Sequence, residues 1–114
     1  LIESRGNIVN TSSVSGLGGD WAMSVYNASK GAVSNFTRAL ALDHGSDGVR
    51  VNAVAPGWID TTGERQFTEA DDMRMMARHL PFGIGRPEHV AKGVSALSAH
   101  TSTSRSHLMV LRTR

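Results

Sequence analysis

Two kinds of hydrophobic spacing alternate along the chain and predict a strand, a helix and a second strand. Residues 7–11 form a short β-branched run that leads into the Ser/Gly-rich stretch 12–19, which is typical of a strand entering a loop. Between residues 24 and 44, apolar residues recur every three or four positions, which predicts a helix with an apolar face. Residues 49–54 are expected to form a second strand, which 56–57 (Pro-Gly) terminates. This order predicts a βαβ unit with parallel strands and a right-handed crossover.

Small residues are frequent in the N-terminal half of the predicted helix, so a neighbouring segment can approach its backbone closely. Gly45 provides the stop signal, and His44 lies in the last turn, where a positive charge suits the helix dipole. The apolar positions of this helix are Val25, Ala28, Ala32, Val33, Phe36, Leu40 and Leu42.

The second half of the chain has a weaker pattern. Residues 58–67 show no period and are expected to form a loop, and a capping-box pattern predicts a short helix over 68–80. After a turn at 83–86, a Pro-Glu pair opens a helix over 87–99 with Val90, Val94 and Leu97 on its apolar side, and 107–111 is a candidate third strand. The pattern therefore predicts an α/β fold, with three parallel strands and crossover helices forming one flank of a doubly wound sheet.

Composition narrows the function classes. The 114 residues suffice for one domain with a modest core, and the lack of cysteine excludes disulfides and thiol nucleophiles and fits a reducing, cytoplasmic location. The net charge of +2 is scattered, whereas nucleic acids need a clustered basic face, so no nucleic-acid partner is expected. No apolar stretch approaches the roughly 18 to 20 residues that span a bilayer, so no membrane partner is expected either. The five histidines lack metal-binding spacing, and no metal site is predicted.

Three side chains carry the candidate chemistry. Tyr26 and Lys30 are four residues apart on the predicted helix and share one face. Ser13 follows the first strand, at the edge of the sheet where open α/β folds bind ligands. Hydride transfer between a nicotinamide ring and a carbinol carbon also requires a proton to leave or join the oxygen. An unassisted phenol is a poor base at neutral pH, but an ammonium about 4–6 Å away favours its ionised form, and a hydroxyl can hold the reacting oxygen.

Four motifs, in matching order and spacing, resemble the second half of a short-chain dehydrogenase/reductase. They are Asn-Thr-Ser-Ser-Val-Ser-Gly (10–16), Tyr-Asn-Ala-Ser-Lys-Gly-Ala-Val (26–33), Arg-Val-Asn-Ala-Val-Ala-Pro-Gly (50–57) and Gly-Arg-Pro-Glu (85–88). The resemblance implies that 1–114 is the C-terminal catalytic portion of a single Rossmann-like domain whose dinucleotide-binding half is absent. Residues 100–114 match poorly, because Leu-Arg-Thr-Arg stands where the family has Asp-Gly-Gly.

The resemblance also implies a role for each matching residue, with NAD or NADP as the cofactor. Ser13 would orient the substrate oxygen, Tyr26 would be the general acid/base, and Lys30 would activate Tyr26 and hydrogen-bond the nicotinamide ribose. Three further roles fall on the residues that follow the second strand. Pro56 and Gly57 would form a wall beside the nicotinamide, and the Ile59 backbone and the Thr61 side chain would hold its carboxamide. Trp58 and residues 62–80 would form a substrate-binding lid. Taken singly, each of these residues has an ordinary structural explanation, and their common register favours the chemical one.

Partners and alternatives follow from the same resemblance. The substrate would be a small-molecule alcohol or ketone, and the helix that holds Tyr26 and Lys30 would pack against its counterpart in a homodimer or homotetramer. The competing hypothesis is a catalytically incompetent fragment that acts at most as an oligomerisation or binding module, because the Gly-rich phosphate loop is absent. On either hypothesis the 114 residues alone are expected to be poorly soluble or loosely folded.

Overall fold

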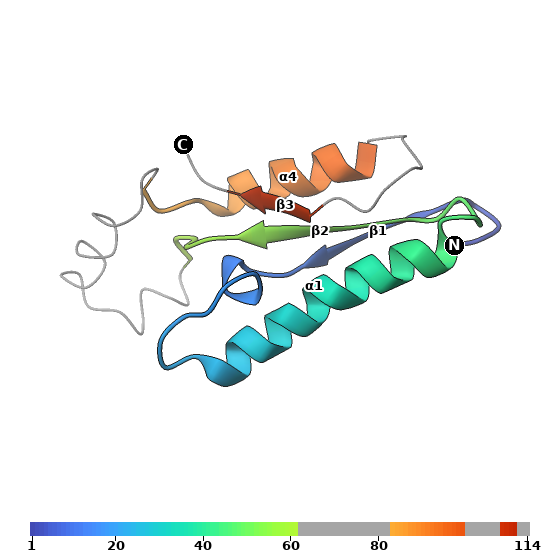
Figure 1. Cartoon of the computed structure of the whole chain (residues 1–114). Coiled ribbons are helices and arrows are strands. Elements are labelled where there is room, and N and C mark those ends of the chain that lie inside the picture. Colours follow the sequence, from blue (N-terminus) through green and yellow to red (C-terminus); the bar gives the residue numbers. More distant parts are fainter. Residues whose placement is uncertain (62–82, 100–107, 112–114) are drawn as a thin grey trace.

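The structure, a computed structural model, describes residues 1–61, 83–99 and 108–111. In chain order its elements are strand β1 (Asn7–Thr11), the 3-10 turn η1 (Val14–Gly16), helix α1 (Ser24–His44), strand β2 (Arg50–Pro56), helix α4 (Pro87–Ala99) and strand β3 (Leu108–Leu111). Figure 1 shows them in that arrangement. The helix predicted over 68–80 and most of the loop before it lie outside the described residues.

The predicted elements are confirmed wherever the structure describes them. The first strand and both helices have the expected bounds, and the third strand begins at Leu108. The second strand covers 50–56 instead of 49–54, because the sheet continues through Pro56, which pairs with Leu111. Proline has no backbone N–H, but Pro56 removes no hydrogen bond from the interior of the ladder, because β2 ends at this residue.

β2 lies in the middle of the sheet and forms the core. The strand order is β1-β2-β3, and both pairings are parallel. Val51, Ala53, Val54 and Ala55 are at most 1% exposed. A strand buried on both faces carries a nearly continuous run of small apolar residues, as Arg50–Pro56 does.

α1 and α4 cover opposite faces of the sheet (Figure 1). The Asn10 side chain of β1 donates to Thr37 on α1, and the Arg50 side chain of β2 donates to the Leu97 carbonyl on α4. Arg50 pairs with Asn7, which is three residues from Asn10 and therefore points to the other face. Because the strands lie in the order β1-β2-β3, the two crossovers have opposite hands, and only one of them follows the right-handed rule.

α1 does not bury the apolar side chains that were expected to form its packing face. Its buried residues are Ser34 and Thr37, each 2% exposed. The physical reason is that β1 presents polar side chains to this helix, so hydroxyl groups make the contact. Five of the seven predicted apolar positions are exposed instead: Val25, Ala28, Ala32, Phe36 and Leu42.

The end of α1 also differs in detail from the expectation. Gly45 is the C-cap but keeps helical geometry, with φ −61°. The left-handed residue is Gly48, at φ +76°, a conformation that glycine adopts without a steric penalty. His44 Nδ1 lies 3.1 Å from Asp47 Oδ2, so a side chain of the following turn pairs with the histidine of the last helical turn.

Candidate active site

Ser13 is held in place just beyond the carboxyl end of β1. The Ser12 N–H donates to the Val54 carbonyl and so extends the pairing with β2 by one residue. Ser13 then turns the chain into η1 as its N-cap: its Oγ accepts from the Ser15 N–H at 3.2 Å. The Ser13 hydroxyl donates to Ser15 Oγ, also at 3.2 Å, and Ser13 is 8% exposed. The hydroxyl is therefore oriented by its own turn.

Tyr26 and Lys30 lie in the first two turns of α1, as their four-residue spacing predicts. The Lys30 ammonium Nζ lies 5.8 Å from the centre of the Tyr26 ring. It donates a hydrogen bond of 3.1 Å to the carbonyl of Thr11, the last residue of β1. Tyr26 is 41% exposed, so its ring is accessible at this edge of the sheet. The ammonium thus bridges the phenol ring and the end of β1.

Backbone contacts bring the Ser13 turn against the same part of α1. The Ser12 hydroxyl donates to the Lys30 carbonyl at 3.0 Å. A Cβ added to Gly16 would lie 2.5 Å from the carbonyl carbon of Lys30 and 2.9 Å from the Gly31 nitrogen, so only glycine permits this approach. Ser13 lies in sequence between these two contacts with Lys30. The close approach of η1 to the α1 backbone therefore depends on Gly16, to which the sequence interpretation assigned no such role.

The segment after β2 contributes a second wall at the same edge of the sheet, because β1 and β2 are parallel neighbours. Pro56 is buried at the end of β2. Ile59 then forms a parallel bridge with Gly85. The hydrogen bonds of this bridge join Gly85 to the Trp58 carbonyl and the Asp60 N–H, each at 2.8 Å. The N–H and C=O of Ile59 itself therefore point away from Gly85.

The other predicted cofactor and substrate positions differ in burial. Gly57 and Trp58 are half-buried, whereas Thr61 is exposed. Trp58 Nε1 is buried and has no hydrogen-bond partner among the residues that the structure describes. The expected lid over 62–80 lies outside those residues.

Comparison with known proteins identifies the family. Residues 1–105 match the family described as "Enoyl-(Acyl carrier protein) reductase". Meso-2,3-butanediol dehydrogenase from Serratia marcescens is 62% identical over 99 residues, which are 87% of this chain and 39% of the relative. The chain belongs to the short-chain dehydrogenase/reductase family. It spans about two fifths of the length of this curated relative.

Solved structures of the short-chain dehydrogenase/reductase family share the fold. ElxO with NADP bound has a TM-score of 0.78 and 29% identity, covering 96% of this chain and 46% of ElxO. 3-hydroxyacyl-CoA dehydrogenase type-2 from Mycobacterium avium has a TM-score of 0.81 and 31% identity, covering 93% of this chain and 41% of that enzyme. The α/β architecture of parallel strands with crossover helices is thus the family's, and the chain is homologous to its NAD(P)-dependent oxidoreductases.

Three residues that contact the backbone of Lys30 had no role in the prediction from sequence: Ser12, Gly16 and Ser34. Ser12 and Ser13 are consecutive at a strand end, so their side chains diverge, and only one of them can face the helix. Ser34 is four residues after Lys30, within reach of its carbonyl. The Ser12-Ser13 pair and the four-residue step from Lys30 to Ser34 are both present in the sequence. Only the packing of the β1 end against α1 brings Ser12 and Ser34 together.

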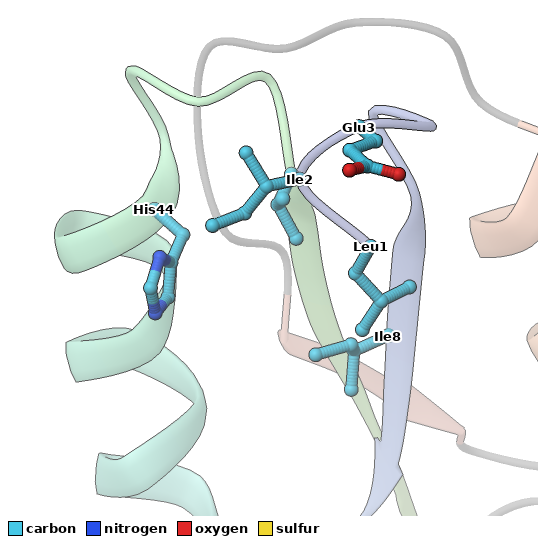
Figure 2. Close-up of a pocket in the computed structure, with 6 residues that line it drawn as sticks. Leu1, Ile2, Glu3, Ile8 and His44 are labelled. Atoms are coloured by element: carbon cyan, nitrogen blue, oxygen red, sulfur yellow. The ribbon is translucent and has the colours of Figure 1, made fainter.

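One hollow in the described residues lies away from the candidate site. It has a volume of about 390 Å³ and lies between the first three residues, Ile8, Val49 and His44 (Figure 2). His44 ends α1. It is therefore about 27 Å along the helix axis from Tyr26, given a rise of about 1.5 Å per residue. The hollow is at the opposite edge of the sheet from the carboxyl ends of the strands.

Residues 1–61, 83–99 and 108–111 lack two further features. These residues contain no group of three His, Asp or Glu side chains that could hold a metal ion. None of their helices is long and apolar enough to cross a membrane.

Proposed function

We propose that this chain is the catalytic portion of an NAD(P)-dependent enzyme that interconverts a secondary alcohol and a ketone, with Ser13, Tyr26 and Lys30 as its catalytic residues. The observation that carries the proposal is the position of the Lys30 ammonium, 5.8 Å from the Tyr26 ring centre and hydrogen-bonded to the end of β1. The Lys30 ammonium therefore places a positive charge beside the Tyr26 ring, at the strand end that Ser13 follows.

In the oxidising direction, the substrate hydroxyl gives its proton to the Tyr26 oxygen as hydride leaves the carbinol carbon. In the reducing direction, Tyr26 returns that proton to the ketone oxygen. The Ser13 hydroxyl, whose present bond to Ser15 Oγ is a long 3.2 Å, turns to donate to the substrate oxygen and stabilises the charge that develops there. A nicotinamide cofactor, when bound, accepts or supplies the hydride.

The residues after β2 fit this cofactor. The Ile59 N–H and C=O point away from the Gly85 bridge, so a carboxamide, which offers both a donor and an acceptor, can pair with them. Gly57 adds no side chain beside Pro56, which leaves room for a flat ring. Thr61 is exposed and can donate or accept at the same group. Lys30 would hydrogen-bond the ribose, and either NAD or NADP satisfies these contacts.

The substrate class that fits best is a small neutral alcohol or ketone. Trp58 follows Pro56-Gly57 directly and provides an apolar surface beside the proposed reaction centre. The Serratia marcescens relative, 62% identical over 99 residues, is named for meso-2,3-butanediol. A vicinal diol such as this one is therefore the first substrate to assay, together with the corresponding hydroxyketone in the reducing direction.

The outward face of α1 fits the homodimer or homotetramer contact implied for this helix. Val25 is 82% and Phe36 58% exposed, and Ala28, Ala32 and Ala39 are exposed as well. These five residues follow one another at steps of three or four and form a stripe, the α1 stripe, on the side away from the buried Ser34 and Thr37. Small residues within such a stripe allow two helices to approach closely.

The decisive test is Tyr26→Phe in the full-length protein. Removal of the phenol oxygen is expected to lower turnover at least 100-fold, because general acid-base catalysis contributes about 10²- to 10⁴-fold. The Kd of the cofactor should stay within about twofold. Ser29→Ala is the matched control, because it also removes one hydroxyl from this helical turn, one that donates only to the Tyr26 carbonyl. Near-normal turnover of Tyr26→Phe would contradict the mechanism.

A further inference from the structure

A closed set of hydrogen bonds joins the end of β1 to the carbonyl of Lys30. The Ser12 and Ser34 hydroxyl oxygens are 2.6 Å apart, and they lie 3.0 and 3.1 Å respectively from the Lys30 carbonyl oxygen. Ser12 is 3% and Ser34 2% exposed, so water does not compete for these groups. Both serines are absent from the proposed catalytic trio, which leaves their burial beside Lys30 to be explained.

The two hydroxyl groups have two hydrogens to place, and both placements end on Lys30. If Ser12 donates to Ser34, then Ser34 donates to the Lys30 carbonyl; if Ser34 donates to Ser12, then Ser12 donates to that carbonyl. The pair is therefore satisfied in either arrangement. The two serines are not equivalent, however, because Ser34 is on the same helix as Lys30 and only Ser12 links the strand to the helix.

Two consecutive residues, where β1 finishes, hold the side chain and the backbone of Lys30. The Thr11 carbonyl accepts from its ammonium, and the Ser12 hydroxyl donates to its backbone carbonyl. Ser13, the next residue, is the proposed support for the substrate oxygen. A shift of α1 along β1 would therefore change the position of Lys30 and Tyr26 relative to Ser13 in one movement, and a displacement of about 1 Å can cost about 100-fold in rate.

We propose that Ser12 is a positioning residue, which fixes the register between the strand end that holds Ser13 and the helix that holds Tyr26 and Lys30. This inference rests on the proposed function, because it assigns Ser12 to the support of that same site. Ser34 has the lesser role of partner to the Ser12 hydroxyl. Removal of Ser34 leaves Ser12 free to donate to the Lys30 carbonyl, whereas removal of Ser12 breaks the link.

The test compares Ser12→Ala with Ser34→Ala in the full-length protein. Ser12→Ala is expected to raise the cofactor Kd and to lower kcat, normalised to folded enzyme, each about three- to tenfold, which is the scale of one buried hydrogen bond. Ser34→Ala should leave both quantities within about twofold of wild type. Ser12→Cys, close in size but a weak donor, should change them in the same direction as Ser12→Ala and replaces it if the alanine variant does not fold.

Thr37→Ala is the control for a purely structural role. Thr37 accepts from Asn10 of β1 and so makes the neighbouring strand–helix link, two turns beyond Lys30. The Thr37→Ala variant should lower the midpoint of thermal unfolding, as Ser12→Ala does, but should leave the cofactor Kd and kcat unchanged. Equal effects of Ser12→Ala and either control, or no effect of Ser12→Ala and Ser12→Cys, would overturn the positioning role. Tyr26→Phe, assayed in parallel, shows separately whether the proposed function itself fails.

Discussion

At Gly16, the turn after β1 lies directly against the backbone of α1. A Cβ there would lie 2.5 Å from the Lys30 carbonyl carbon, 2.6 Å from its oxygen and 2.9 Å from the Gly31 nitrogen, and all three are backbone atoms that cannot rotate away. We expect Gly16→Ala to destabilise the protein by about 1–3 kcal/mol, the usual cost of overpacking, and to reduce activity because η1 must move off Lys30. Urea unfolding of the full-length protein gives the stability change.

Gly18→Ala is the matched control for this prediction. A Cβ on Gly18 meets no atom within 4 Å, so the substitution should change stability by no more than about 0.5 kcal/mol. If Gly16→Ala were equally harmless, the close approach of η1 to Lys30 would be absent from the protein in solution.

At the scale of single residues, the sequence predicted that Tyr26 and Lys30 lie together, but it did not predict the contacts that hold Lys30 in place. Tyr26 and Lys30 share a face because the helical period fixes their relation, and this relation is local in sequence. The bond from Ser12 to Lys30 spans 18 residues and depends on how β1 docks against α1. No local period encodes that docking, so Ser12 and Gly16 became evident only in three dimensions.

Among the elements, α4 is tied to the sheet by one side chain of β2. The Arg50 guanidinium donates to the carbonyls of Leu97 and Ser98, each at 3.0 Å, in the last turn of the helix. These carbonyls lack intrahelical partners, and a positive charge there also suits the helix dipole. Arg50→Ala should therefore destabilise the protein by about 1–3 kcal/mol and speed amide exchange in α4 selectively. The exposed Arg38→Ala on α1 is the control and should do neither.

The α1 stripe, which consists of Val25, Ala28, Ala32, Phe36 and Ala39, is the proposed surface for contact with a second copy of the chain. Phe36 is the largest exposed side chain within it. Phe36→Glu places a charge in the middle of the proposed helix–helix contact, where burying it unpaired is costly. We expect the full-length protein to shift to a smaller oligomer in sedimentation velocity. Arg38→Glu adds the same carboxylate outside the stripe, and an unchanged oligomer in both variants would exclude this contact.

The sequence predicted α1 itself but not the side on which it packs. Ser34 and Thr37 are buried, and their hydroxyl groups satisfy both their own helix and the polar side chains of β1. A helical spacing of apolar residues predicts that one face of the helix is covered. It does not predict whether the same chain or a second copy covers that face. For α4, where Leu97 is buried against the sheet, the apolar side and the packing side coincide.

At the scale of the whole molecule, β1 has one unpaired edge. It pairs with β2 only, within the part of the chain that the structure describes, and the sheet order places it at the end. The N–H and C=O groups along its other side have no ladder there, and such an edge promotes aggregation unless another strand or a covering segment occupies it. The exposed α1 stripe adds apolar surface on the adjacent face.

Because of this open edge and the exposed stripe, the 114 residues by themselves are not expected to form a stable enzyme. A comparison with the full-length protein decides between an oxidoreductase and an oligomerisation or binding module. We expect the isolated chain to melt without a sharp cooperative transition, and to show no heat of NAD or NADP binding in calorimetry, because nothing within it supplies a phosphate loop. The full-length protein should show both a sharp melting transition and a measurable heat of cofactor binding. If the full-length protein also bound no cofactor, the oligomerisation or binding module would be the better account. A sharp transition of the isolated chain would instead show that the edge of β1 needs no neighbour, and the argument from the open sheet would fail.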